Sequence, residues 1–147
     1  MSASIDIKDQ IISRIESLDS VQKVYPAENI NPDGFPAVFV VSTNMEGEFS
    51  SNIENSRVYA YSITILFPEG KDFVPETERD RLDYAERVIS QVIDEIINAV
   101  DTDYELDSFP VLFVNAADCE WGTYQTEGGV AKAANITLRV YTEKVVA

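Results

Sequence analysis

Apolar residues recur at helical spacing in two segments of the chain. From Ser4 to Leu18 they fall three or four positions apart, and Ser4 or Asp6 stands where a helix cap is needed. A second stripe runs over residues 75–100, and Pro75 suits the first helical turn. This stripe consists of Leu82, Ala85, Ile89, Val92, Ile93, Ile96 and Val100. We therefore predict a short N-terminal helix and a long amphipathic helix in the middle of the chain.

Alternating or continuous apolar runs predict five strands. They lie at residues 21–26, 36–42, 57–67, 109–118 and 130–145. In the third run, the residues that share one face are Tyr59, Tyr61, Ile63 and Ile65, and the opposite face also carries apolar residues. Because both faces have residues that can pack, we place this strand centrally in a sheet.

The element order is α-β-β-β-α-β-β, with few helices and with strands that follow one another. This order favours an α+β fold, in which two helices pack on a mostly antiparallel (mixed) sheet of four to five strands. The sequence shows no linker and no internal repeat, so residues 1–147 are expected to form a single domain.

A long polar stretch separates the second and third predicted strands. We expect residues 44–56 to form a loop, although a hairpin needs only two to five residues to turn. Within it, Met45, Phe49 and Ile53 are apolar and spaced by four, among Glu46, Glu48 and other polar residues. The stretch is either an irrelevant surface loop or a docking element, with Met45, Glu46, Glu48, Phe49 and Ile53 as candidate interface residues.

The chain is strongly acidic, with 26 Asp and Glu against 11 Lys and Arg and a formal net charge of −15. Tight binding to nucleic acid requires clustered basic residues, so direct binding is not expected. The acidity serves either solubility or a surface that must not adhere to DNA. No apolar run is long enough for a membrane span. The single cysteine and the lack of a signal peptide predict synthesis in a reducing cytoplasm.

The residues offer little chemistry. There is no histidine, and Cys119 is the only cysteine, so the usual histidine-based and cysteine-rich sites are absent. The segment that begins at Asp101 resembles the start of a calcium loop, but Leu106 and Leu112 stand where Gly and Glu are required. We therefore predict no catalytic residue, no cofactor and no metal site. Cys119 is expected to be a small buried side chain.

Two aromatic residues, Trp121 and Tyr124, lie in the segment 119–129, where we expect the fourth strand to break off. An aromatic side chain can stack on a ligand, but it can equally pack on a sheet or contact another subunit. We favour core or subunit contact, and Trp121 and Tyr124 join the candidate interface residues.

Several segments together resemble the tail terminator, or tail-completion, proteins of long-tailed bacteriophages. These are a short N-terminal helix, "VQKVYPAENI", "GFPAVFVVS", a polar stretch, "YAYSITILFPE", a long amphipathic helix and the closing "ANITLRVYTEK". The resemblance covers nearly the whole chain as a pattern of elements. It implies a structural virion protein without catalytic residues.

The resemblance also implies partners and a place of action. Members of this family form a homo-hexameric ring that caps the tail tube protein, stops tail polymerisation and presents a surface to the head-tail connector protein. The protein would be located in the virion, at the phage tail and neck, after synthesis in the host cytoplasm. No membrane and no direct nucleic-acid partner is implied.

Two other readings stay open. One is a head-completion or connector protein of the phage neck. The other, from a different class, is a small ligand-binding or enzymatic α+β domain that works through carboxylates and tyrosines.

Overall fold

The computed structural model describes residues 3–27, 32, 34–49, 54–68, 78–101, 111–127 and 129–145. In these residues the chain forms two helices and five strands, in the order expected from the sequence. The elements are α1 (Ala3–Glu16), β1 (Lys23–Tyr25), β2 (Ala37–Phe49), β3 (Glu54–Pro68), α2 (Glu78–Asp101), β4 (Val111–Thr126) and β5 (Gly129–Val145). The predicted α+β class is confirmed.

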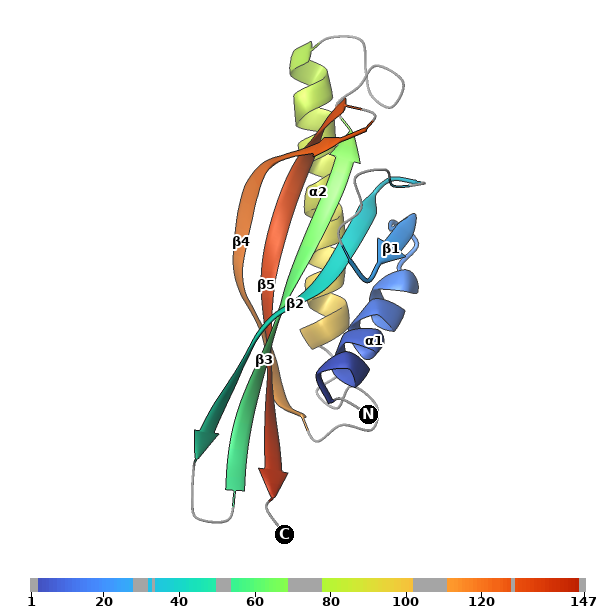
Figure 1. Ribbon diagram of the computed structural model, residues 1–147. Helices are drawn as coiled ribbons and strands as arrows, with labels where there is room; N and C mark the ends of the chain where they lie inside the picture. Colours follow the sequence, from blue (N-terminus) through green and yellow to red (C-terminus); the bar gives the residue numbers. More distant parts are fainter. Residues whose placement is uncertain are drawn as a thin grey trace.

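The strands form one mixed sheet in the order β1-β2-β3-β5-β4. β1 runs parallel to β2, and the other neighbouring pairs are antiparallel. Both helices lie on the same face of this sheet (Figure 1). α2 carries the chain from β3 to the far edge, and β5 then returns between β3 and β4. The central position predicted for β3 is therefore confirmed.

The main core fills the space between the helices and the sheet. α1 contributes Ile7, Ile11 and Ile15, which recur at helical spacing and are buried. The buried face of α2 consists of Ala85, Ile89, Val92, Ile93 and Ile96. Burying one large aliphatic side chain stabilises a fold by roughly 1.5–3 kcal/mol. These five members of the predicted stripe are thus confirmed as the core face of α2, and the side chains of Leu82 and Val100 lie outside the described part of the chain.

Alternate residues of the central strands face the helices. On β3 these are Tyr59, Tyr61, Ile63, Ile65 and Phe67, and on β5 they are Ala134, Ile136, Leu138 and Val140. Side chains alternate between the two faces of a strand, so the residues between them point to the opposite face. There a smaller buried cluster forms from Ala37, Phe39, Leu66, Ala131 and Ala133.

The hairpin between β2 and β3 is much longer than the sequence predicts. β2 extends to Phe49 and β3 begins at Glu54, with Phe49 paired to Asn55, so the expected loop over residues 44–56 is wrong at both ends. β3 is paired on its other side as well, where Glu54 lies opposite Val145 of β5. The polar residues 44–49 stay in strand conformation because they pair with β3. β3 is held in place there because its own backbone groups are paired on both sides, with β2 and with β5. An irregularity between Ser42 and Asn44 is the one interruption of this ladder in the described residues.

β4 is also longer than expected. The sequence suggested a break after residue 118, but the strand continues to Thr126 and pairs with β5 up to Gly129. The glycine at position 129 has a φ of 125°, a conformation that glycine adopts without the steric cost of a Cβ. The turn between β4 and β5 therefore lies close to Gly129, at the end of the segment 119–129 and not at its start.

Candidate functional site

Within the described residues, no three His, Cys, Asp or Glu side chains lie together in a way that could hold a metal ion. Cys119 lies on β4 and is exposed, so the expectation of a buried cysteine is wrong. The reason is topological, since β4 is the outermost strand of the sheet. Partial desolvation raises the pKa of the Cys119 thiol, which lowers the fraction of reactive thiolate at neutral pH.

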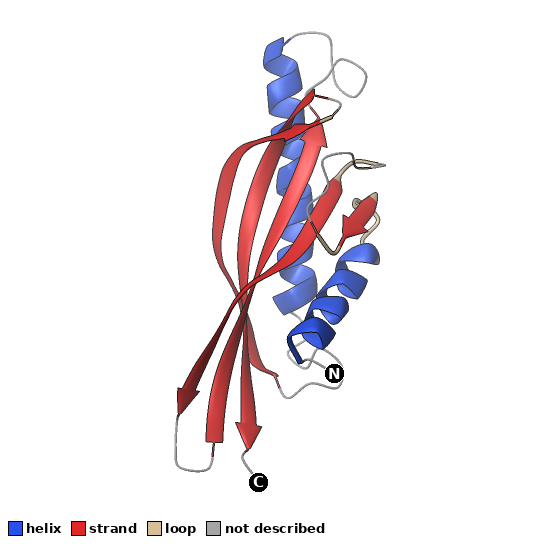
Figure 2. Ribbon diagram, in the orientation of Figure 1, coloured by secondary structure: helices blue, strands red, loops and turns tan. Residues whose placement is uncertain are grey.

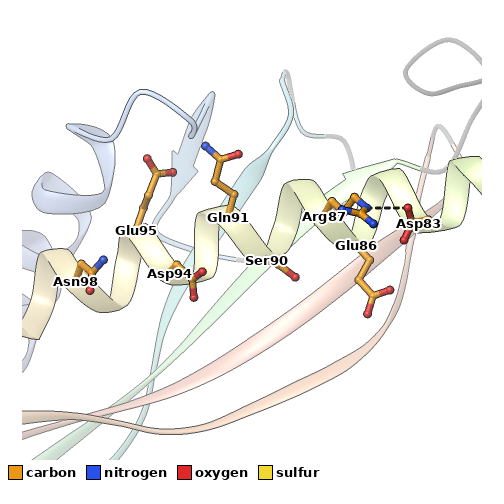
Figure 3. A pocket seen from close by; sticks show the side chains of 8 residues that line it. All are labelled: Asp83, Glu86, Arg87, Ser90, Gln91, Asp94, Glu95 and Asn98. Carbon is orange, nitrogen blue, oxygen red and sulfur yellow. Dashed lines mark hydrogen bonds and ion pairs between the residues drawn. The ribbon is translucent and has the colours of Figure 1, made fainter.

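One hollow lies along the outer face of α2 and has a volume of about 600 Å³ (Figure 3). Its lining consists of Asp83, Glu86, Arg87, Ser90, Gln91, Asp94, Glu95 and Asn98. All of these residues belong to one helix, so the hollow is an open, acidic surface and not a cleft with facing walls. A reaction site needs groups that converge on a substrate from more than one side.

One contact lies within this helix face and another links it to a neighbouring segment. Arg87 Nε donates a hydrogen bond of 2.7 Å to Asp83 Oδ2 one turn away, and this carboxylate raises the pKa of the guanidinium. The pair is exposed, as is typical of a solvated helical ion pair. Ser20 Oγ donates a hydrogen bond to Glu95, which links α2 to the segment that follows α1. Both contacts are structural in character.

A second hollow lies on the face of the sheet opposite the helices, beside β4, with a volume of about 250 Å³. It is lined by Thr64, Glu120, Trp121, Gly122, Thr123, Tyr124, Ala133, Ala134 and Asn135. The space exists because Gly122 has no side chain, and a Cβ at this position would meet no atom within 4 Å. Asn135 Nδ2 donates hydrogen bonds to Thr64 Oγ1, at 2.8 Å, and to Ser62 Oγ, which fixes the polar floor of the hollow.

Trp121 and Tyr124, the aromatic pair of the sequence-based prediction, have different environments. Tyr124 is half-buried and its ring packs edge-on against Phe39, so it belongs to the smaller cluster. Trp121 is 42% exposed, and Lys132 Nζ lies 5.5 Å from its ring centroid. This distance is within the range of a cation–π contact. Tyr124 is thus a packing residue, and Trp121 is an accessible aromatic surface.

The other candidate interface residues lie in β2, except for Ile53, which lies outside the described residues. Met45, Glu46, Glu48 and Phe49 are paired with Tyr59, Val58, Ser56 and Asn55 of β3, respectively. Figure 1 shows this end of β2 and β3, with the end of β5, extending beyond both helices. We call this extension of β2, β3 and β5 the arm; it comprises residues 44–49, 54–57 and 141–145.

The sequence-based prediction missed Gly122, Lys132 and Asn135. A signal for Gly122 was present in "CEWGTYQT", where Glu120, Gly122 and Tyr124 alternate with Cys119, Trp121 and Thr123. This period of two is typical of a strand with two different faces. It places Gly122 between two larger residues of the same face, which predicts a gap in that face.

No protein-family model and no curated protein matches this chain. The resemblance to tail terminators therefore stays a prediction. Neither of the helices in the described residues is long and apolar enough to cross a membrane.

Proposed function

We propose that the protein is a structural component of a bacteriophage tail, a tail terminator that forms a ring on the end of the tail tube and stops its growth. In this role it presents its opposite surface to the head-tail connector. Its function is then to bind other protein subunits through its surface.

The arm is the observation that carries this proposal. A ring subunit must contact two sister subunits as well as the tube and the connector, so it needs surface beyond its own compact body. The arm supplies such surface, because its strands continue past the two helices (Figure 2). Its backbone is paired over this length, with Glu48 opposite Ser56 and Asn55 opposite Lys144. A paired arm is a preorganised contact element, and less entropy is lost when it docks.

The sequence of the arm suits a docking role. It is mostly polar, with Asn44, Glu46 and Glu48 in β2, and carries Met45 and Phe49 as large apolar residues. A few apolar residues within a polar surface are typical of protein interfaces, in which a small number of side chains contribute most of the binding energy.

The net charge supports the same function. A ring at the junction of head and tail surrounds the path of the DNA, and a charge of −15 per subunit repels phosphate. Repulsion prevents the passing duplex from adhering to the channel wall. The acidic outer face of α2 contributes to this charge through Asp83, Glu86, Asp94 and Glu95.

The decisive experiment adds the purified protein to polymerising tail tubes of a candidate phage and measures tube length by electron microscopy. We expect tubes of finished length that carry a ring at one end, and overlong tubes without the protein. A matched control is a variant in which a tight turn replaces residues 46–55, with the body left unchanged. If the intact protein leaves tube length unaltered and instead binds isolated connectors, it belongs to the neck of the virion, and the tail-terminator proposal is wrong.

A further inference from the structure

We propose that the free edge of β4, from Glu120 to Gln125, binds an extended segment of a partner protein in which basic and apolar side chains alternate. The segment adds to the sheet as one more strand beside β4. This site is separate from the arm, and the inference does not depend on a role in phage tails.

The edge of β4 is open and regular. β4 is the last strand in the order of the sheet, with β5 on one side and no described strand on the other. From Asp118 to Thr126 its register with β5 has no irregularity, whereas both register shifts lie earlier in the strand. The residues from Cys119 to Thr123 are all exposed. Such a strand presents a row of backbone N–H and C=O groups to solvent.

This edge also lacks the usual protection. Natural proteins block free edges with lysine, proline or bulges that prevent another strand from pairing. The segment "CEWGTYQT" contains neither lysine nor proline, and Glu120 is its one charged residue. An unblocked edge of this length is suited to strand addition, in which the backbone provides affinity and side-chain pockets provide specificity.

The hollow beside Gly122 provides such a pocket. Glu120, Gly122 and Tyr124 alternate along β4 and therefore share the face that lies away from the helices. A side chain that enters the hollow would lie between Tyr124 and Glu120, above Ala133 and Asn135. A lysine or arginine fits this arrangement, because its alkyl stem packs on the tyrosine while its charged end reaches the Glu120 carboxylate.

On the opposite face of the sheet, apolar side chains of the partner strand would pack best against β4. Trp121 is 42% exposed and Val130 is 48% exposed, and by register both belong to the helix-facing side of the sheet. Both side chains are therefore partly open to solvent. A strand added beside β4 would place its alternate side chains on the same face as Trp121. Apolar residues at these positions would shield the indole ring from water. The two faces together specify a partner strand with alternating basic and apolar residues.

Charge favours such a segment over a second copy of this chain. Two copies would approach with −15 each, and both β4 edges carry Glu120. Like charges on directly paired strands destabilise the pairing. A basic segment would instead be attracted by the negative charge of this chain. The charge of the chain is therefore complementary to a basic segment of a different protein.

The test uses Trp121 as an internal reporter, since it is the single tryptophan of the chain. The probe is a short capped peptide in which lysine alternates with valine, titrated into the full-length protein. We expect a saturable blue shift of the fluorescence as the peptide covers the indole ring. Two further peptides carry N-methyl groups on one or the other alternate set of amides. One set faces β4 and the other faces solvent, so one peptide should bind about tenfold more weakly and the other as the parent does.

Protein variants locate the site. Gly122→Val fills the hollow and Glu120→Lys reverses the charge at its mouth, and each should weaken the parent peptide about tenfold. Asp94→Lys is the matched control, because it makes the same change of net charge on the outer face of α2 and should leave binding nearly unchanged. Circular dichroism verifies that each variant is folded.

Three results would overturn the proposal. Equal binding of the two methylated peptides would mean that the backbone edge is not used. Equal weakening by Glu120→Lys and Asp94→Lys would reduce the interaction to attraction by net charge. Concentration-dependent self-association that Gly122→Val abolishes would assign the edge to a second copy of the chain.

Discussion

The rings of Phe39 and Tyr124 contact each other across the sheet, with centroids 5.6 Å apart and ring planes at 67°. Phe39 lies on β2 and Tyr124 on β4, and both β3 and β5 lie between these strands. Neighbouring strands are about 4.8 Å apart, so a flat sheet would hold the two strands roughly 14 Å apart. The contact therefore requires the sheet to curl toward this face. The small Ala131 and Ala133 of β5 leave room for the rings to meet above them.

The first prediction concerns the energetic coupling of these two rings. In a double-mutant cycle with Phe39→Leu and Tyr124→Leu, the interaction free energy should be about 0.5–1.5 kcal/mol, the usual range for an edge-to-face aromatic pair. Urea denaturation of the four proteins measures it. A coupling free energy of zero would mean that the rings are merely adjacent, and that the backbone of the sheet produces the curl without them.

The second prediction concerns the helical layer. Ile93→Ala should lower the free energy of unfolding by roughly 2–5 kcal/mol, because Ile93 is 8% exposed in the main core. Ile5→Ala on α1 is the matched control, since Ile5 is 49% exposed and its truncation should change stability by less than about 0.5 kcal/mol. Equal effects of the two substitutions would contradict the packing of α2 on the sheet.

The third prediction concerns nucleic acid. With a net charge of −15, the isolated protein should not retard duplex DNA in a gel at about 0.15 M salt. Lowering the salt should not create binding either, because the electrostatic term is repulsive. A micromolar affinity at this ionic strength would reveal a basic patch and would contradict the repulsive channel of the proposed ring.

The fourth prediction concerns the arm. Phe49→Asp should abolish tail completion in a complementation assay while the melting temperature stays nearly unchanged. The reason is that β2 ends at Phe49, which is paired with Asn55, and this end of β2 extends beyond both helices. Ile5→Asp is the matched control, because it also replaces an apolar residue by aspartate, at an exposed position of α1 outside the arm, and it should leave tail completion unchanged. A large fall in melting temperature would instead assign Phe49 to the core of the subunit, and full activity would exclude the arm as a docking element.

The fifth prediction concerns Cys119. Its desolvation raises the pKa of the thiol, so the thiolate forms at a higher pH than in an unfolded peptide. The rate of alkylation by iodoacetamide should therefore rise with pH along a curve displaced upward from that of a cysteine in a short peptide. Urea-unfolded protein supplies the reference curve. A curve displaced toward lower pH would point to a cationic neighbour and to a reactive cysteine.

Much of the fold could be predicted from the order of residues alone. The helical period of Ile7, Ile11 and Ile15, and that of Ile89, Val92 and Ile96, identified both helices and their buried faces. The alternation of Tyr59, Tyr61, Ile63 and Ile65 identified the face of β3 that packs in the main core. These patterns succeed because one face of each element must be buried, and the period of a helix or a strand makes that face visible in the sequence.

The lengths of the strands and the candidate site depended on the tertiary structure. The polar residues 44–49 carry no strand pattern of their own, and they are strand because β3, itself paired to β5, continues beside them. Likewise, the exposure of Cys119 and Trp121 follows from the position of β4 at the edge of the sheet, which sequence order does not reveal. The sequence by itself determined which face of each element is buried, since that information is local and periodic. Only the tertiary structure decided which strands became neighbours and which edge stayed open, because strand pairing joins residues that are far apart in the chain.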